Sequence, residues 1–488
     1  MKYRLPVLAL LTASWGCVYY NGLWNAHRWA ADAQQKEREG QHEAAVVSWS
    51  QAAVEAESVA VHHPHSGWLP DALVTAAEGL AGSRDCTSAA PYFTRIPAVT
   101  TDSALLERAA LAQAACALDA GDVDGAAALA RPVLSSKDQG RRDRAALLAG
   151  RAEVQRRRFE DAASILARSP DRAAGVEEVM AVLDAGRTER ADSLCDPLVR
   201  RKPLEEDWDS IFAGFARNAG AEVASRVVGR VVPRARLTAG ERARLFLADG
   251  YRLLQSRDPM AAGQRFQQAE TAAPDSAEAD KAKVAAIWAQ VAQTRDVDSV
   301  AVFNVALVPF ATDGSAVTDA RQLRGILGQL IAPDTSVTGA FRAGEIARDS
   351  LYADPLAASL LLGFARRQPT SLFAAKAIVA ALPMSPERAE SLSQTLDVRY
   401  ATSPYFLATR GSLSPGYGQA EDSLARLFGI RAAPVVATGA GPQLSATWTA
   451  PQTGRRGPLL NPPDVVPARP TVKTPGPAGR RGVADTLK

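Results

Sequence analysis

The stretch that decides the fold is residues 238–276, TAGERARLFLADGYRLLQSRDPMAAGQRFQQAETAAPDS. Thr238 and Glu241 have the spacing of a capping box, which starts a helix by pairing side chains with free backbone N–H groups. Taking Ala243 as position 1, bulky and small residues follow at positions 4, 8, 20, 24 and 27, and a proline at position 32: Phe246, Gly250, Ala262, Phe266, Ala269 and Pro274. This pattern predicts a pair of helices.

The spacing resembles the tetratricopeptide repeat, in which small residues sit where two helices cross and a proline closes the second helix. Leu253 stands at position 11 in place of the usual tyrosine. Small residues expected at mid-helix recur along the chain at intervals of 29 to 45 residues: Ala45, Ala90, Ala126, Ala162, Ala191, Ala224 and Ala262. Such a period indicates stacked helix–turn–helix units.

Composition favours an all-α chain. Hydrophobic residues make up 47% of the 488 residues, aromatics only 6%, and much of the apolar share is alanine, a strong helix former. We expect a tetratricopeptide-like α-solenoid over residues 17–286 and further helical repeats, or a separate helical domain, over 287–429. Residues 430–488 are rich in Pro and Gly, which predicts a disordered tail.

Charge is unevenly distributed. The segment 430–488 has eight basic and two acidic residues, a net +6, whereas the whole chain carries +3. The preceding part is therefore mildly acidic, at about −3, and nucleic acid is not an expected partner.

The N-terminus is typical of an export signal. Lys2 and Arg4 precede the apolar run Leu5–Ala13, which is too short to span a bilayer. Ser14-Trp-Gly-Cys17 resembles a bacterial lipoprotein processing site, which implies signal-peptide residues 1–16 and lipidation of Cys17. Ordinary signal cleavage is the alternative reading. The non-acidic Val18 favours, by the same resemblance, an outer-membrane location facing the periplasm.

The N-terminal half carries a further resemblance. Gly40, His42, Ala45, Trp49 and Ala52 are followed by the turn His63-Pro-His-Ser-Gly-Trp68. This is similar to the outer-membrane assembly lipoproteins of the BamD-like (YfiO) group, where an aromatic-Pro-x-Ser turn joins two helices. Here His63 replaces the aromatic and the proline falls seven residues late. The resemblance implies a role in envelope assembly.

Three cysteines remain besides Cys17. Cys86 is expected near the start of one helix and Cys116 near the end of the next, and antiparallel neighbours bring these ends together. A Cys86–Cys116 disulfide is therefore reasonable, with Cys195 as a free buried thiol. The alternative is that all three are small core residues.

No motif predicts catalysis, a cofactor or a metal site. His42-Glu43 begins like a zinc-protease helix, but Val46 stands where the second histidine is required. His62, His63 and His65 are interpreted as a polar turn. The acidic cluster Glu205 to Asp209 is interpreted as a solvated helix start.

We therefore expect a non-enzymatic scaffold that binds other envelope proteins through a concave repeat surface and the membrane through its lipid. The alternative is a glycan-binding outer-membrane lipoprotein, which would need exposed aromatic side chains in one cleft. Trp24 and Trp29 are expected either in the core or, close to the lipid, at the membrane interface.

Overall fold

The computed structural model describes residues 22–332, 336–412 and 414–427. Every regular element in these ranges is a helix, which confirms the all-α prediction. The predicted signal peptide 1–16, Cys17 and the tail 430–488 lie outside the described residues.

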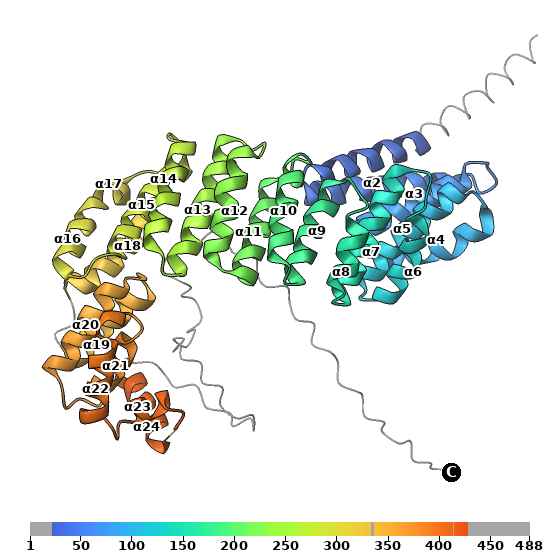
Figure 1. Cartoon of the computed structure of the whole chain (residues 1–488). Helices are drawn as coiled ribbons and strands as arrows, with labels where there is room; N and C mark the ends of the chain where they lie inside the picture. Colours follow the sequence, from blue (N-terminus) through green and yellow to red (C-terminus); the bar gives the residue numbers. More distant parts are fainter. Residues whose placement is uncertain (1–21, 333–335, 413, 428–488) are drawn as a thin grey trace, which may run out of the picture.

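The first part of the chain is a regular series of helices (Figure 1). Residues 22–38 form a helix, and the elements that follow are α2 (His42–His62), α3 (Leu69–Gly82), α4 (Cys86–Val99), α5 (Ser103–Asp119), α6 (Val123–Val133), α7 (Gln139–Gln155), α8 (Phe159–Leu166), α9 (Arg172–Asp184), α10 (Thr188–Val199), α11 (Glu205–Ala219), α12 (Ala221–Val231), η1 (Val232–Arg234), α13 (Ala239–Gln255), α14 (Pro259–Ala272) and α15 (Ala277–Val291).

The series continues with shorter and less regular elements. They are α16 (Val297–Ala306), α17 (Val308–Thr312), α18 (Val317–Ile331), α19 (Val337–Asp349), α20 (Asp354–Arg367), α21 (Ala374–Ala381), η2 (Pro386–Arg388), α22 (Ala389–Arg399), α23 (Pro404–Thr409) and α24 (Pro415–Leu427). In Figure 1 the helices from α19 onward form a bundle bent away from the long axis of the stack.

The helices are stacked in two layers. Each helix from α2 to α21 packs against the next in sequence, and from α3 to α15 each odd-numbered helix also contacts the next odd-numbered one. Contacts between neighbouring even-numbered helices are sparse in the same region. The odd-numbered helices therefore form the closely packed layer, and the chain is a tetratricopeptide-like α-solenoid, as predicted.

Close helix crossings explain the glycine at position 8 of the repeat. A Cβ built on Gly250 would lie 2.4 Å from the Phe266 ring, and one on Gly150 would lie 2.5 Å from Leu166. Leu166 follows Gly150 by the same number of residues as Phe266 follows Gly250, so both pairs match positions 8 and 24 of the repeat, and Phe266 and Leu166 are fully buried. The glycine lets the ring or leucine fill the crossing, which is where the apolar area is removed from water.

The predicted capping box is present. Thr238 Oγ1 accepts from the Glu241 N–H at 3.3 Å, and a Glu241 carboxylate oxygen accepts from the Thr238 N–H at 2.6 Å. Aspartate side chains cap seven other helices, each accepting a backbone N–H of the first turn: Asp85, Asp102, Asp122, Asp138, Asp171, Asp258 and Asp296. The start of each of these helices is thus determined by a capping residue directly before it in the sequence.

All seven periodic alanines lie within helices, as predicted, and six are buried, but in α4 the buried small residue is one position before Ala90. Ala90 is exposed and Ala89 is buried in its place, beside Ala81, Ala112 and Cys116. Ala89 lies seven residues before the buried Ile96 and shares its face of α4. The rotation of α4 is set by these contacts, which a fixed spacing cannot supply.

The largest hydrophobic cluster runs from Ala162 to Ala357 and crosses residue 287, and a second lies between Phe341 and Leu424. The segment between α19 and α20 joins the two regions. Its Tyr352 ring stacks on Trp288 of α15, with centroids 5.8 Å apart. Arg257, just beyond α13, pairs with Asp354 at 2.5 Å and lies over Tyr352. These contacts fix the bundle against α13 and α15.

Candidate functional site

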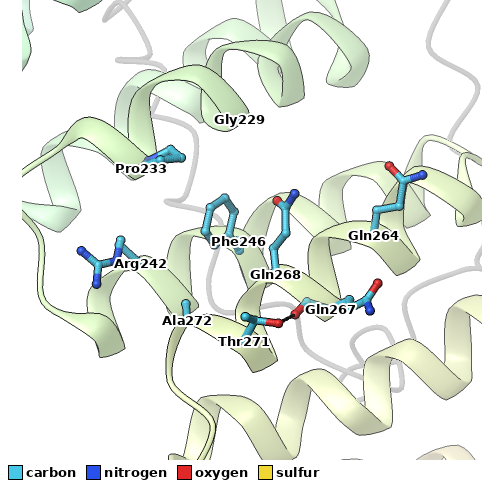
Figure 2. A pocket seen from close by; sticks show the side chains of 9 residues that line it. All are labelled: Gly229, Pro233, Arg242, Phe246, Gln264, Gln267, Gln268, Thr271 and Ala272. Carbon is cyan, nitrogen blue, oxygen red and sulfur yellow. Dashed lines mark hydrogen bonds between the residues drawn. The ribbon is translucent and has the colours of Figure 1, made fainter.

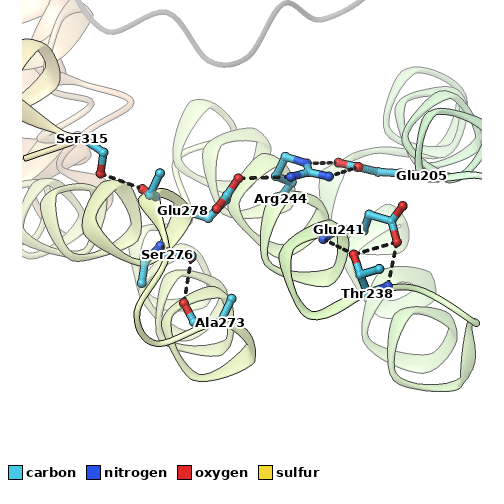
Figure 3. A network of polar contacts seen from close by, with 10 residues as sticks. Glu205, Thr238, Glu241, Arg244, Ala273, Ser276, Glu278 and Ser315 are labelled. Carbon is cyan, nitrogen blue, oxygen red and sulfur yellow. Dashed lines mark hydrogen bonds and ion pairs between the residues drawn. The ribbon is translucent and has the colours of Figure 1, made fainter.

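A chain of ion pairs crosses the odd-numbered layer, and Figure 3 shows the part that joins α11, α13 and α15. Arg244 of α13 binds both carboxylate oxygens of Glu205 at the start of α11, at 2.7 and 2.6 Å. The same guanidinium donates to Glu278 at the start of α15, at 3.1 Å. One arginine therefore links three successive repeats by the two-pronged geometry that lysine cannot provide.

The same arrangement recurs at the other steps of this layer. Each neighbouring pair from α3 to α13 has at least one arginine–carboxylate contact: Arg108 with Asp71 and Glu78, Arg141 with Glu107, Arg151 with Glu177, Arg172 with Asp207, and Arg252 with Asp209. We call these pairs, together with Glu205–Arg244–Glu278, the arginine ladder. At the N-terminal end, His27 lies 3.1 Å from Asp71.

The ladder corrects the interpretation of the acidic cluster at α11. Glu205, Asp207 and Asp209 are paired with arginines of neighbouring helices and are not simply solvated. Of the four acidic residues, only Glu206 is exposed. Sequence reasoning missed the pairing because the arginines lie 35 to 43 residues away, although this distance is close to the repeat length and could have been searched for.

The ladder positions helices and offers no free acid–base pair. Burial alone would raise the pKa of Glu278, but hydrogen bonds from its own backbone N–H and from Arg244 outweigh it and lower that pKa. A carboxylate held in this way stays charged near neutral pH, and its oxygens are already engaged in hydrogen bonds. The ladder is therefore interpreted as an element that positions the helices and not as a catalytic site.

An open groove of about 620 Å³ lies between the even-numbered helices α12 and α14 (Figure 2). We call it the α12–α14 groove. Its lining residues are Gly229, Pro233, Arg242, Phe246, Gln264, Gln267, Gln268, Thr271 and Ala272. Gln267 and Gln268 each lie three or four positions from both Gln264 and Thr271, so the four residues share one face of α14. None of the nine lining residues is acidic.

The floor of the groove is fixed by a buried polar cluster. Arg265 donates to Asp249 at 2.8 Å and to the Ser225 carbonyl at 2.5 Å, and lies over the Phe246 ring at 5.9 Å. Burial raises the pKa of Asp249, although hydrogen bonds from Ser225 and Arg265 oppose the shift. Its second oxygen has no hydrogen-bond partner among the described residues. The cluster keeps the groove open because its members are held from three helices.

The cysteines are placed as follows. Cys86 and Cys116 are joined by a disulfide, with Cα atoms 5.5 Å apart, and Cys195 is a free, buried thiol. Burial raises the pKa of the Cys195 thiol to about 12, which suppresses the reactive thiolate form. The lipidation candidate Cys17 lies outside the described residues.

Most of the N-terminal tryptophans are at the surface. Trp24 and Trp68 are each 50% exposed and Trp29 is 38% exposed, whereas Trp49 is fully buried and donates to Glu37 at 2.8 Å. Within the described ranges, no cluster of three or more His, Cys, Asp or Glu side chains could hold a metal ion. None of the helices described there is both long and apolar enough to cross a bilayer.

Comparisons with known proteins return fold likeness alone. No family model matches the chain, and no curated protein matches it. A tetratricopeptide repeat protein from Parabacteroides merdae is 12% identical, with 54% of this chain and 98% of the other aligned and a TM-score of 0.32. A chain of the Naa15/Naa10 complex bound to HypK-THB is 13% identical, with 82% and 63% aligned and a TM-score of 0.28.

Proposed function

We propose that this protein is a non-enzymatic scaffold that binds other proteins of the bacterial envelope through its repeat surface. The observation that carries the proposal is the α12–α14 groove, whose glutamine amides face outward on a floor held by Arg265. Gln264, Gln267 and Gln268 are exposed, and an amide both donates and accepts hydrogen bonds. Such a surface suits a polypeptide partner, which offers the same groups along its backbone.

The rigidity of the stack also supports a binding role. Because the arginine ladder ties each odd-numbered helix to the next, the repeat surface is held in shape before a partner arrives. Preorganisation of this kind reduces the entropy lost on binding. A catalytic role would need a free nucleophile or general base in a cleft, and the lining of the groove supplies neither.

The location we propose is the periplasmic face of the outer membrane, with the chain anchored by a lipid on Cys17. Support comes from the N-terminal sequence, in which a short apolar run precedes Gly16-Cys17. A part in envelope assembly, by likeness to the BamD-like group, is the finer form of this proposal.

Crosslinking and pull-down from native membranes test the proposal, with Cys17→Ala as the matched control for anchoring. We expect a defined set of envelope proteins that is recovered with the parent chain and lost with Cys17→Ala. Recovery of no protein, with the chain still membrane-bound, would contradict the scaffold.

The second candidate is a glycan-binding lipoprotein, and its supporting observation is the exposure of Trp24, Trp29 and Trp68, whose indole rings are available for stacking on sugars. A glycan array probed with the full chain and with Trp68→Ala separates the two. Binding that depends on Trp68, without a protein partner, would favour the second candidate.

A further inference from the structure

We propose that the α12–α14 groove is a binding site for a segment of the protein's own C-terminal tail, residues 458–467 (PLLNPPDVVP). The inference rests on the proposed function in treating the groove as a polypeptide site, and goes beyond it by assigning the occupant. A tail bound there would compete with any external partner for the same groove.

The chemistry of the groove selects the segment. Arg242 lies at one end and Gln264 at the other, with the Phe246 ring and the glutamines between them (Figure 2). Arg242 donates to the Leu237 carbonyl at 3.0 Å through one nitrogen, and its guanidinium brings the only formal charge among the nine lining residues. The site therefore calls for one anionic group next to uncharged, hydrogen-bonding chain.

Only one part of the tail meets this requirement. Residues 430–488 contain two acidic side chains, Asp464 and Asp485. Asp464 lies within ten residues that carry no basic side chain, whereas Asp485 is followed closely by the C-terminal Lys488. The segment 458–467 is thus the acidic stretch of an otherwise basic tail, and is complementary in charge to Arg242.

The backbone of this segment suits the glutamine face. Its four prolines favour an extended chain with about 3.1 Å per residue and with carbonyls free to accept hydrogen bonds. The α14 face from Gln264 to Thr271 is about 10 Å long, which corresponds to roughly three such residues. Amide Nε2 groups of Gln264 and Gln267 would donate to these carbonyls, and Val465 or Val466 would contact Phe246 and Pro233.

The tail is long enough to reach the groove. The described chain ends with α24 at Leu427, so about 30 residues precede Pro458, which can span up to about 100 Å. The bundle that carries α24 is held next to the end of α13 by the Arg257–Asp354 pair, and α13 forms part of the groove.

Site-specific photocrosslinking in the full chain tests the assignment. A benzophenone side chain is placed at Gln264 and, as the matched control, at Gln155, an exposed helical glutamine of α7. We expect an intramolecular product between position 264 and residues 458–467, identified by peptide mass, and none from position 155. Absence of that product at 264, or a product of dimer size, would overturn the proposal.

A charge exchange tests the residue pairing. Arg242→Glu and Asp464→Arg should each lower the crosslink yield by about tenfold, because each removes the charge-assisted contact. The double variant should restore the yield, which a folding defect in either single variant would not do. Equal yields in all four proteins would overturn the Arg242–Asp464 pairing. The membrane pull-down is a separate measurement. Absence of the intramolecular crosslink would contradict the tail assignment but not the scaffold proposal, and absence of protein partners in the pull-down would contradict the scaffold proposal but not the tail assignment.

Discussion

Trp288 Nε1 donates a hydrogen bond to the Leu351 carbonyl at 2.9 Å, although the two residues are 63 positions apart. The bond joins α15 of the solenoid to the segment between α19 and α20. Trp288 is only 4% exposed and Leu351 is fully buried, so water does not readily replace the donor. This bond, the Tyr352–Trp288 stacking and the Arg257–Asp354 pair together hold the bundle against the solenoid.

Replacing Trp288 by Phe should loosen this junction. The ring stacking is largely kept, but the Leu351 carbonyl loses a donor in a buried site, at a cost of about 1–3 kcal/mol. We expect faster hydrogen exchange of the amides between Arg348 and Asp354, measured by mass spectrometry. Trp24→Phe, at a half-exposed position, is the control and should leave exchange in this segment unchanged.

Gly250→Ala should destabilise the solenoid at one crossing. The added Cβ would lie 2.4 Å from the buried Phe266 ring, and overpacking of this kind costs about 1–3 kcal/mol. The urea midpoint should fall. Gly325→Ala in α18 is the matched control, because its Cβ meets nothing within 4 Å and alanine is the better helix former. A midpoint for Gly250→Ala at or above the parent value would contradict the packing described.

Reduction of the Cys86–Cys116 bond should destabilise the N-terminal repeats. The bond closes a loop with a sequence separation of 30 residues, for which the chain-entropy model gives about 3–4 kcal/mol. We expect a lower urea midpoint in Cys86→Ser, and no further shift when a reductant is added to that variant. A reductant-sensitive Cys86→Ser protein would show that another bond is present.

Cys195 should stay unmodified in the native protein. It is fully buried and its thiol pKa is raised to about 12, so iodoacetamide at pH 8 meets almost no thiolate. Labelling should appear only on addition of denaturant, and Cys195→Ser should abolish it. Rapid labelling of the native chain at this position would mean that α10 opens locally.

Glu345 should make stability depend on pH. Burial raises its pKa to about 7, although Lys376 and Arg348 oppose the shift. Since the folded-state pKa lies above the unfolded value near 4.5, the folded chain binds this proton more tightly. The resulting stabilisation is present below pH 4.5 and is lost as pH rises through 7, with a magnitude on the order of 3 kcal/mol.

The comparison with Glu345→Gln isolates this group from the other carboxylates. The free energy of unfolding, measured with urea at pH 5 and pH 7.5, should fall more steeply with pH in the parent chain than in the variant. Parallel changes in the two proteins would show that Glu345 is not protonated in the fold.

The sequence predicted those parts of the fold that repeat or act locally. The spacing of Gly250, Ala262 and Phe266 predicted the helix pair, and Thr238 with Glu241 predicted where its first helix starts. Both patterns could be recognised because all of their residues lie within one repeat. The junction at Trp288 and Leu351 could not be predicted, since it pairs residues from different repeats without any common spacing. The α12–α14 groove was missed for the same reason: its glutamines are ordinary surface residues until α12 is placed beside α14.

The arginine ladder also bears on how a partner would arrive. Each guanidinium lies beside at least one carboxylate, and Arg108 and Arg244 each lie beside two, so none of them acts as a free positive charge. Any residual field declines over a Debye length, about 8 Å at physiological ionic strength. The arginine ladder therefore exerts little long-range attraction on diffusing acidic molecules. Capture on that side would depend on collision and fit, with an association rate that changes little as salt is added.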